Sequence, residues 1–249
     1  MPFLTAGDPD LAATARFART LAEHGAHLLE IGFPYSDPIA DGPVIQASYT
    51  RALERGVHVG DIFAAVRAFA VHETPLVAMV SYSLIHRRGP EAFLEQAASA
   101  GFSGAIVPDL PFEESEALSG LAAARDFKLI HLVTPTTPRD RARAIAQRST
   151  GFLYCVSVAG ITGERERVPA ELLDQLAWLR QQTEVPLCVG FGISKPEHVR
   201  TLREVADGVI VGSAFVRHLE KAGTPSLDVI DTAIGNLAQS LADALNPTS

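Results

Sequence analysis

Short apolar runs recur along the chain, and longer segments with helical patterns separate them. The runs are mostly continuous rather than alternating, which is typical of parallel strands that are buried on both faces. Most runs begin 23 to 33 residues after the one before, which suits one strand–helix unit. The eight predicted strands begin near Phe3, His27, Leu76, Gly104, Lys128, Phe152, Val185 and Gly208.

A strand–helix repeat without a linker predicts one α/β domain over residues 1–249, folded as a single (β/α)8 TIM barrel. An open doubly wound sheet is the alternative, but no G-x-G-x-x-G motif follows the first strand. Since the first strand begins near residue 3, we expect the N-terminal helix that caps the bottom of a barrel to be missing. Asp8 before Pro9 predicts a helix N-cap, and Ser194 with Glu197 predicts a capping box.

Composition and charge narrow the class of protein. Hydrophobic residues make up 47% and charged residues 20%, which is typical of a globular chain. A net charge of −8 argues against nucleic acid or an anionic membrane as a partner. No apolar stretch is long enough to predict a transmembrane helix, and no signal peptide is recognisable. Cys155 and Cys188 lie in apolar runs, so we expect buried thiols in a cytoplasmic protein.

Carboxylates cluster at and after the second predicted strand. Alternation along residues 28–32 turns Glu30 toward the mouth of the barrel, where burial would raise its pKa into the range of a general acid. The alternative is a structural Glu30 that is ion-paired with an Arg or Lys. Asp37 and Asp41 follow in a long loop that emerges at the catalytic face of such a barrel. Both aspartates could equally serve only to cap turns.

Glycines cluster after the last three predicted strands, at residues 160–163, 190–194 and 212–213. The loops after the seventh and eighth strands of a barrel, with the start of a helix, form its usual phosphate site. Glycine lets the backbone approach a phosphate closely, so we expect a phosphate there. The alternative is that these glycines only serve tight turns.

The scarcity of other reactive residues narrows the chemistry further. Lys128, Lys195 and Lys221 are the only lysines, and none is predicted to lie in the barrel mouth, which argues against a Schiff-base aldolase. The eight histidines include no pair with ligand spacing at the end of a strand, so no catalytic metal is expected. With a Schiff base and a catalytic metal both disfavoured, the reaction type that remains is proton transfer by carboxylates on a phosphorylated small molecule.

Four segments resemble the tryptophan synthase α-subunit family, and the resemblance runs from residue 2 to about residue 220. It implies a retro-aldol cleavage of indole-3-glycerol phosphate to indole and glyceraldehyde 3-phosphate. By similarity, Glu30 is the general acid and base, and Asp41 holds the indole N–H and stabilises the indolenine cation. The segments are PFLTAGDP at 2–9, LEIGFPYSDPIADGPVIQ at 29–46, GITG at 160–163 and GFGIS at 190–194.

The resemblance also implies substrate contacts and a partner. A pyridoxal-phosphate-dependent β subunit would complete an α2β2 heterotetramer, and no cofactor is expected in this chain itself. Pro34 and Asp37 match residues of the loop that touches the β subunit. The family's remaining site residues match Phe3, Tyr154, Thr162 and Phe191 around the indole, and Gly163, Gly192, Gly212 and Ser213 around the phosphate.

Two other functions fit the same residues. A stand-alone indole-glycerol-phosphate lyase would use the same carboxylates and release free indole. A non-catalytic subunit that only activates a β partner would not need Glu30 and Asp41, and the chain has both.

Overall fold

The computed structural model describes residues 1–39, 41–69, 73–156, 169–190, 192–220 and 226–246. Each of the eight predicted strands is present, and all the strand pairs are parallel. The fifth predicted strand is divided at His131 into two short pieces. The strands are β1 (Phe3–Thr5), β2 (Leu29–Gly32), β3 (Leu76–Met79), β4 (Phe102–Ile106), β5 (Lys128–Ile130), β6 (Leu132–Val133), β7 (Leu153–Val156), β8 (Leu187–Gly190) and β9 (Gly208–Ile210).

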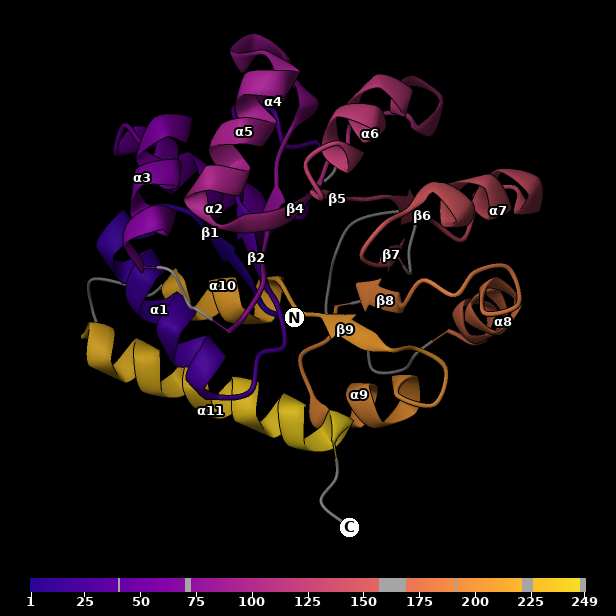
Figure 1. Ribbon diagram of the computed structural model, residues 1–249. Coiled ribbons are helices and arrows are strands. Elements are labelled where there is room, and N and C mark those ends of the chain that lie inside the picture. Colours follow the sequence, from indigo (N-terminus) through magenta and orange to yellow (C-terminus); the bar gives the residue numbers. More distant parts are fainter. Residues whose placement is uncertain (40, 70–72, 157–168, 191, 221–225, 247–249) are drawn as a thin grey trace.

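Two sheets, ordered β1-β2-β3-β4-β5 and β6-β7-β8-β9, meet at both of their edges. At one edge, β5 and β6 are consecutive parts of the same strand. At the other edge, the amide of Phe3 donates to the carbonyl of Val211 at 2.9 Å, and the amide of Val211 donates to Met1 at 2.9 Å. Figure 1 shows the resulting ring of strands at the centre with helices around it, which confirms the predicted barrel.

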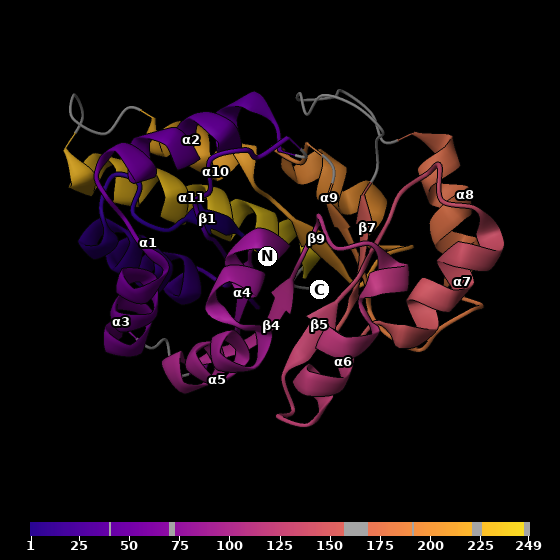
Figure 2. The same ribbon diagram turned by 90° about the horizontal axis from the view of Figure 1, so that it is seen from above.

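Helices cover the outside of the barrel between successive strands (Figure 1). The long C-terminal helix α11 packs on α1 and α9, and α2 packs against α10 near the mouth (Figure 2). The helices are α1 (Leu11–Glu23), α2 (Pro43–Glu54), α3 (Val59–Phe69), α4 (Tyr82–Arg88), α5 (Pro90–Ala100), the 3-10 helix η1 (Phe112–Glu114), α6 (Glu116–Ala123), α7 (Arg139–Arg148), α8 (Ala170–Leu179), α9 (Pro196–Leu202), α10 (Ser213–Leu219) and α11 (Leu227–Leu245).

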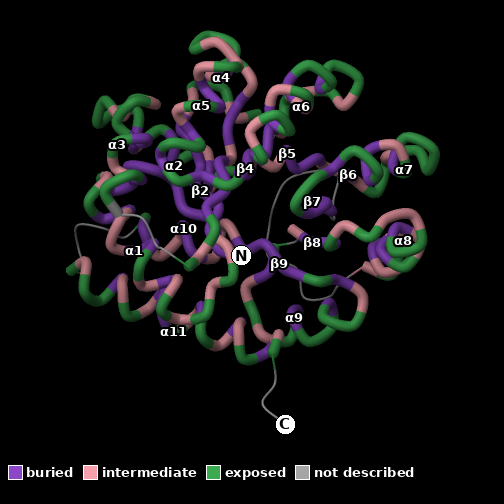
Figure 3. The backbone as a smooth tube through the Cα atoms, in the orientation of Figure 1, coloured by how far each residue is buried: buried purple, intermediate pink, exposed green. Residues whose placement is uncertain are grey.

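The core has an outer and an inner layer, and alternation along each strand decides which residue enters which. On β2, Leu29 and Ile31 are fully buried in the outer layer, against the helices, so Glu30 faces the inside. Each large apolar side chain in these layers contributes about 1.5–3 kcal/mol through its burial. Figure 3 shows this burial concentrated at the strands and on the inward faces of the helices. The inner layer contains Val77, Ile106, Ile130, Phe152, Cys188 and Ile210.

Two predicted helix starts are wrong. The N-cap of α1 is Asp10, whose Oδ1 accepts from the amide of Ala13 at 2.7 Å. Asp8 is instead buried and accepts two hydrogen bonds from Arg51, a partner 43 residues away that no local pattern reveals. Helix α9 begins after Lys195 rather than after Ser194, so the capping box does not form. Among the described residues, no helix combines the length and apolar character needed to cross a membrane.

Candidate active site

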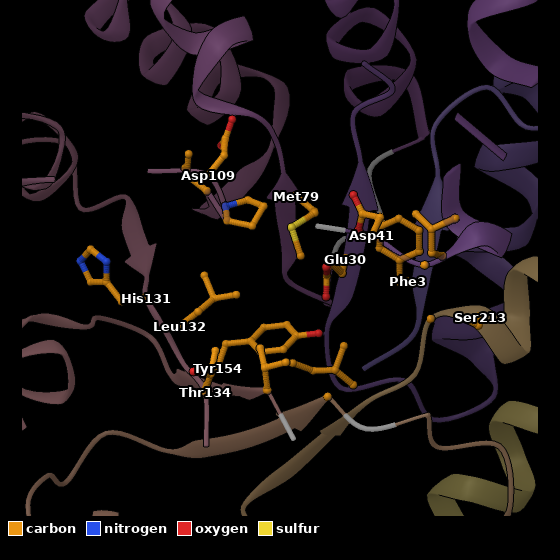
Figure 4. Close-up of a pocket in the computed structure, with 18 of the residues that line it drawn as sticks. Phe3, Glu30, Asp41, Met79, Asp109, His131, Leu132, Thr134, Tyr154 and Ser213 are labelled. Carbon is orange, nitrogen blue, oxygen red and sulfur yellow. The ribbon is translucent and has the colours of Figure 1, made fainter. Parts of the chain in front are cut away.

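A cavity of about 630 Å³ lies at the carboxyl ends of the strands. Residues on strands around the barrel line this cavity, including Glu30 of β2, Met79 of β3 and Tyr154 of β7. Figure 4 shows Glu30, Asp41 and Phe3 gathered on one side of it, with Tyr154 extending across. This is the face of a barrel at which active sites are built, as the sequence predicted.

Glu30 is 2% exposed and lies within β2, where it pairs in register with Phe3 and Val77. Among the described residues no Lys or Arg forms an ion pair with it, so the structural alternative of an ion-paired glutamate is not supported. Burial, assisted by the charge of Asp41, raises the pKa of Glu30 to about 8. The carboxyl group therefore keeps its proton at neutral pH and can act as an acid.

Asp41 reaches the cavity from the loop that joins β2 to α2. Its amide donates to the carbonyl of Pro38 at 3.1 Å, which closes a turn immediately before Gly42 and the start of α2. Burial and the nearby charge of Asp109 raise the pKa of Asp41 to about 6. Asp41 is therefore largely ionised at neutral pH while Glu30 is largely protonated, so the two groups hold opposite protonation states in one cavity.

Glycines make room for the aromatic side chains of the site. A methyl group at Gly32 would overlap the ring of Phe3, and one at Gly190 would overlap the hydroxyl end of Tyr154. Phe3 and Tyr154 can therefore lie in the cavity on either side of Glu30 (Figure 4). Burial and the charges of Glu30 and Asp41 keep the pKa of Tyr154 well above its usual range, so its hydroxyl stays neutral.

The predicted phosphate side is formed by backbone after β8 and β9. Gly192, Gly212 and Ser213 all line the cavity, and Ser213 is the first residue of α10. Gly192 has a φ of +32°, which an L side chain rarely adopts. The hydroxyl oxygen of Ser194 is buried here and has no hydrogen-bond partner among the described residues. Thr162, Gly163 and Phe191, which were also predicted to contact the substrate, lie outside the described residues.

The predicted partner loop is only partly exposed. Asp37 is exposed and accepts from the hydroxyl of Ser36 at 2.6 Å, and Ile39 is 93% exposed. Pro34, in the same loop, is buried.

Sequence reasoning missed several residues that line the cavity. Asp109 follows β4, and its carboxylate accepts from the hydroxyl of Ser81 at 2.7 Å and the amide of Tyr82 at 2.8 Å. The position of Asp109, three residues after the end of the apolar strand β4, could have indicated it. His131 is 7% exposed, lines the cavity and has a pKa lowered to about 4 by burial and by Arg148. The described residues contain no cluster of three or more side chains suited to bind a metal.

The fold and the cavity together define a (β/α)8 barrel with two carboxyl groups of raised pKa in a cavity at the carboxyl ends of its strands. The family model described as "Tryptophan synthase alpha chain" matches residues 1–245. The chain belongs to the tryptophan synthase alpha chain family. It is a carbon–carbon lyase of tryptophan biosynthesis, which cleaves indole-3-glycerol phosphate to indole and glyceraldehyde 3-phosphate.

Relatives and solved structures agree with this membership. The chain is 51% identical to the tryptophan synthase alpha chain of Rhodopirellula baltica, with 99% of this chain and 92% of that one covered. It is 47% identical to the alpha chain of a Cyanothece species at the same coverage. The alpha subunit from Legionella pneumophila superposes with a TM-score of 0.89 at 37% identity, covering 99% and 92% of the chains. A Pyrococcus furiosus chain from a structure of the tryptophan synthase a2b2 complex superposes with a TM-score of 0.89 at 39% identity, covering 96% of each.

Proposed function

We propose that Glu30 is the general acid and base of the cleavage and that Asp41 stabilises the cation formed on the indole ring. The observation that supports this assignment is the pair of carboxyl groups in one cavity, with the pKa of Glu30 near 8 and that of Asp41 near 6. At neutral pH this pair offers one proton and one negative charge to the substrate. The resemblance of residues 29–46 to the family motif gives the same two roles.

The reaction then proceeds in two proton transfers. Glu30 gives its proton to C3 of the indole, and positive charge develops at the ring nitrogen, next to the carboxylate of Asp41. The ionised Glu30 next takes the proton of the glycerol hydroxyl on the carbon attached to C3. The bond between that carbon and C3 breaks, its electron pair restores the aromatic ring, and a carbonyl group forms on glyceraldehyde 3-phosphate. Glu30 finishes the cycle protonated.

We assign the binding of the two ends of the substrate to different walls of the cavity. Phe3 and Tyr154 offer aromatic surfaces for the indole, close to Glu30. Gly192, Gly212 and Ser213 offer backbone and a helix start for the phosphate. Family resemblance adds Thr162 and Phe191 to the indole side and Gly163 to the phosphate side. These steps use only side chains and backbone of this chain, and pyridoxal phosphate is expected only in a β partner.

We further propose that the chain acts as the α subunit of an α2β2 complex. The relative from Pyrococcus furiosus comes from such a complex, and the loop that carries Asp41 presents Asp37 and Ile39 at the surface. An exposed Ile39 gains from burial against a partner because it removes apolar surface from water. Pro34 is buried, so it offers no surface of its own.

Indole release from indole-3-glycerol phosphate by the purified chain, with and without added tryptophan synthase β subunit, tests the whole proposal. We expect slow release that rises strongly when the β subunit is present. Fast release that ignores the β subunit would make the chain a stand-alone lyase. No release under either condition, from a chain that is folded by circular dichroism and activates the β subunit, would favour the non-catalytic subunit and contradict the role of Glu30.

A further inference from the structure

The turn that presents Asp41 is held from the side of α2 by a residue one helical turn further on. The amide nitrogen Nε2 of Gln46 donates to the carbonyl of Asp41 at 2.8 Å and to the carbonyl of Pro38 at 3.1 Å. Only the NH2 end of the amide can make these bonds, since its oxygen would face two other oxygens. The N-cap of α2 is Gly42, which has no side chain with which to fix the helix start.

Gln46 can hold this turn in place because α2 is itself anchored to the barrel. The hydroxyls of Thr5 in β1 and Ser48 in α2 lie 2.6 Å apart and share a hydrogen bond. Arg51, one turn further along, makes two hydrogen bonds to the buried carboxylate of Asp8. Tyr49 is 1% exposed against the same wall. Helix α2 is therefore fixed relative to the barrel, and the side-chain amide of Gln46 connects the loop to this fixed helix by hydrogen bonds.

Among the described residues, no other side-chain hydrogen bond connects the turn to a neighbouring element. Its internal backbone bonds run from Asp41 to Pro38 and from Ile39 to Asp37, both within the loop. Such bonds fix the shape of the turn but not its place relative to Glu30 on β2. The two bonds of Gln46 are the ones that join the turn to a neighbouring helix.

We propose that Gln46 is a positioning residue for the cleavage, whose amide holds the backbone at Pro38 and Asp41 so that the carboxylate of Asp41 faces the indole nitrogen. The inference rests on the proposed role of Asp41. A charged group must meet the developing cation in a fixed geometry, and a displacement of about 1 Å can cost roughly 100-fold in rate. Gln46 itself does not line the cavity, so it acts through Asp41.

Three substitutions separate hydrogen bonding from shape. Gln46→Leu removes both bonds, Gln46→Glu keeps the shape but has no N–H to donate, and Gln46→Lys keeps a donor. All four side chains have high helix propensity, so we expect α2 to form in every variant. We expect the Leu and Glu variants to lower kcat about 10- to 100-fold with less than about a threefold change in KM, and the Lys variant to recover part of the loss. Gln239→Leu, on the remote helix α11, is the matched control and should leave kcat unchanged.

A double-mutant cycle with Asp41→Asn, followed by single-turnover indole release, tests whether Gln46 acts through Asp41. We expect Gln46→Leu to change the rate less than about twofold when Asp41 is already Asn. An equal loss in both backgrounds, or a full wild-type kcat for both the Leu and Glu variants, would overturn the inference. A wild-type rate for Asp41→Asn alone would instead overturn the proposed role of Asp41, and with it this inference. If Gln46→Leu fails to fold, the Glu and Lys pair carries the same comparison.

Discussion

Two walls of the cavity are built in different ways. The carboxylate wall, formed by β1, β2, the loop residues 33–39 and 41–42, and α2, is held by side-chain hydrogen bonds and carries Glu30 and Asp41. The glycine wall, formed by the segments after β8 and β9, presents backbone at Gly192 and Gly212 and the start of α10. Side chains move protons and titrate, whereas backbone N–H groups hold an anion at any pH.

Because the walls are built differently, substitutions in each wall should change different measured quantities. Changes in the carboxylate wall should affect kcat, its pH dependence and the stability of the fold. Changes in the glycine wall should affect mainly the binding of the phosphorylated substrate, and so KM.

The largest effect is expected from Glu30→Gln in the carboxylate wall. The amide cannot give and retake a proton, so kcat should fall at least about 1000-fold while a non-cleavable indole phosphate analogue still binds. Glu23→Gln, at the exposed end of α1, is the matched control. Rates come from indole release and binding from calorimetry. A variant that keeps more than a tenth of the rate would show that another group moves the proton.

Stability should also depend on the carboxylate wall, through the ion pair of Asp8 with Arg51. Asp8 is 1% exposed, so Asp8→Asn leaves a guanidinium without its charged partner and should cost about 2 kcal/mol, or about 4–8 °C in Tm. Asp228→Asn is the matched control, because Asp228 is 82% exposed in its pair with Arg16 and should matter little. Thermal unfolding of both variants measures the contrast. Equal shifts in Tm would mean that the buried pair is not special.

The two pKa values of the carboxylate wall predict a bell-shaped pH profile for kcat/KM. Activity needs Asp41 ionised and Glu30 protonated, so it should rise as pH passes about 6 and fall as pH passes about 8, tenfold per unit on each side. In Asp41→Asn the acidic limb should disappear, and the basic limb should move to lower pH because the charge of Asp41 no longer helps to raise the pKa of Glu30. If the acidic limb survived in this variant, the group that titrates near pH 6 would not be Asp41.

Burial of Glu30 should make the fold itself sensitive to pH. Its pKa is raised from 4.5 to about 8, so the unfolded chain releases this proton first as pH increases. The contribution of Glu30 to stability is therefore unchanged below about pH 4.5 and becomes increasingly unfavourable up to about pH 8. Glu30→Gln should gain stability relative to wild type across this range, measured by urea unfolding at several pH values. A constant difference would contradict the raised pKa.

The sequence predicted the position of each wall better than its construction. Alternation along β2 placed Glu30 inside the barrel, because Leu29 and Ile31 require an apolar outer face. The glycines after β8 and β9 marked the other wall because close backbone approach requires them. Such features are local, so a sequence without structural information reveals them.

Long-range partners could not be predicted in the same way. Asp8 was predicted to cap a helix because its residue type and the following Pro9 fit that local role. In the structure its carboxylate instead accepts hydrogen bonds from Arg51 on α2. Gln46 looked like an ordinary helix residue, and only the folded loop brings two carbonyls to its amide. The support of the carboxylate wall is made of such contacts, which depend on tertiary structure that no local pattern encodes.

The smallest effect, and the sharpest test of the glycine wall, is expected at Gly212. A methyl group there would meet Ile45 and Phe3 only at 3.8 Å, an ordinary contact, so the fold does not require glycine at this position. Gly212→Ala should therefore fold normally, and Gly212→Asp should raise KM about tenfold, since it sets a carboxylate against the phosphate, while kcat changes less. Steady-state kinetics at two salt concentrations measure this, because added salt should lessen the repulsion. If Gly212→Asp lowered kcat and left KM alone, the phosphate would lie elsewhere, and the two walls would not divide catalysis from binding.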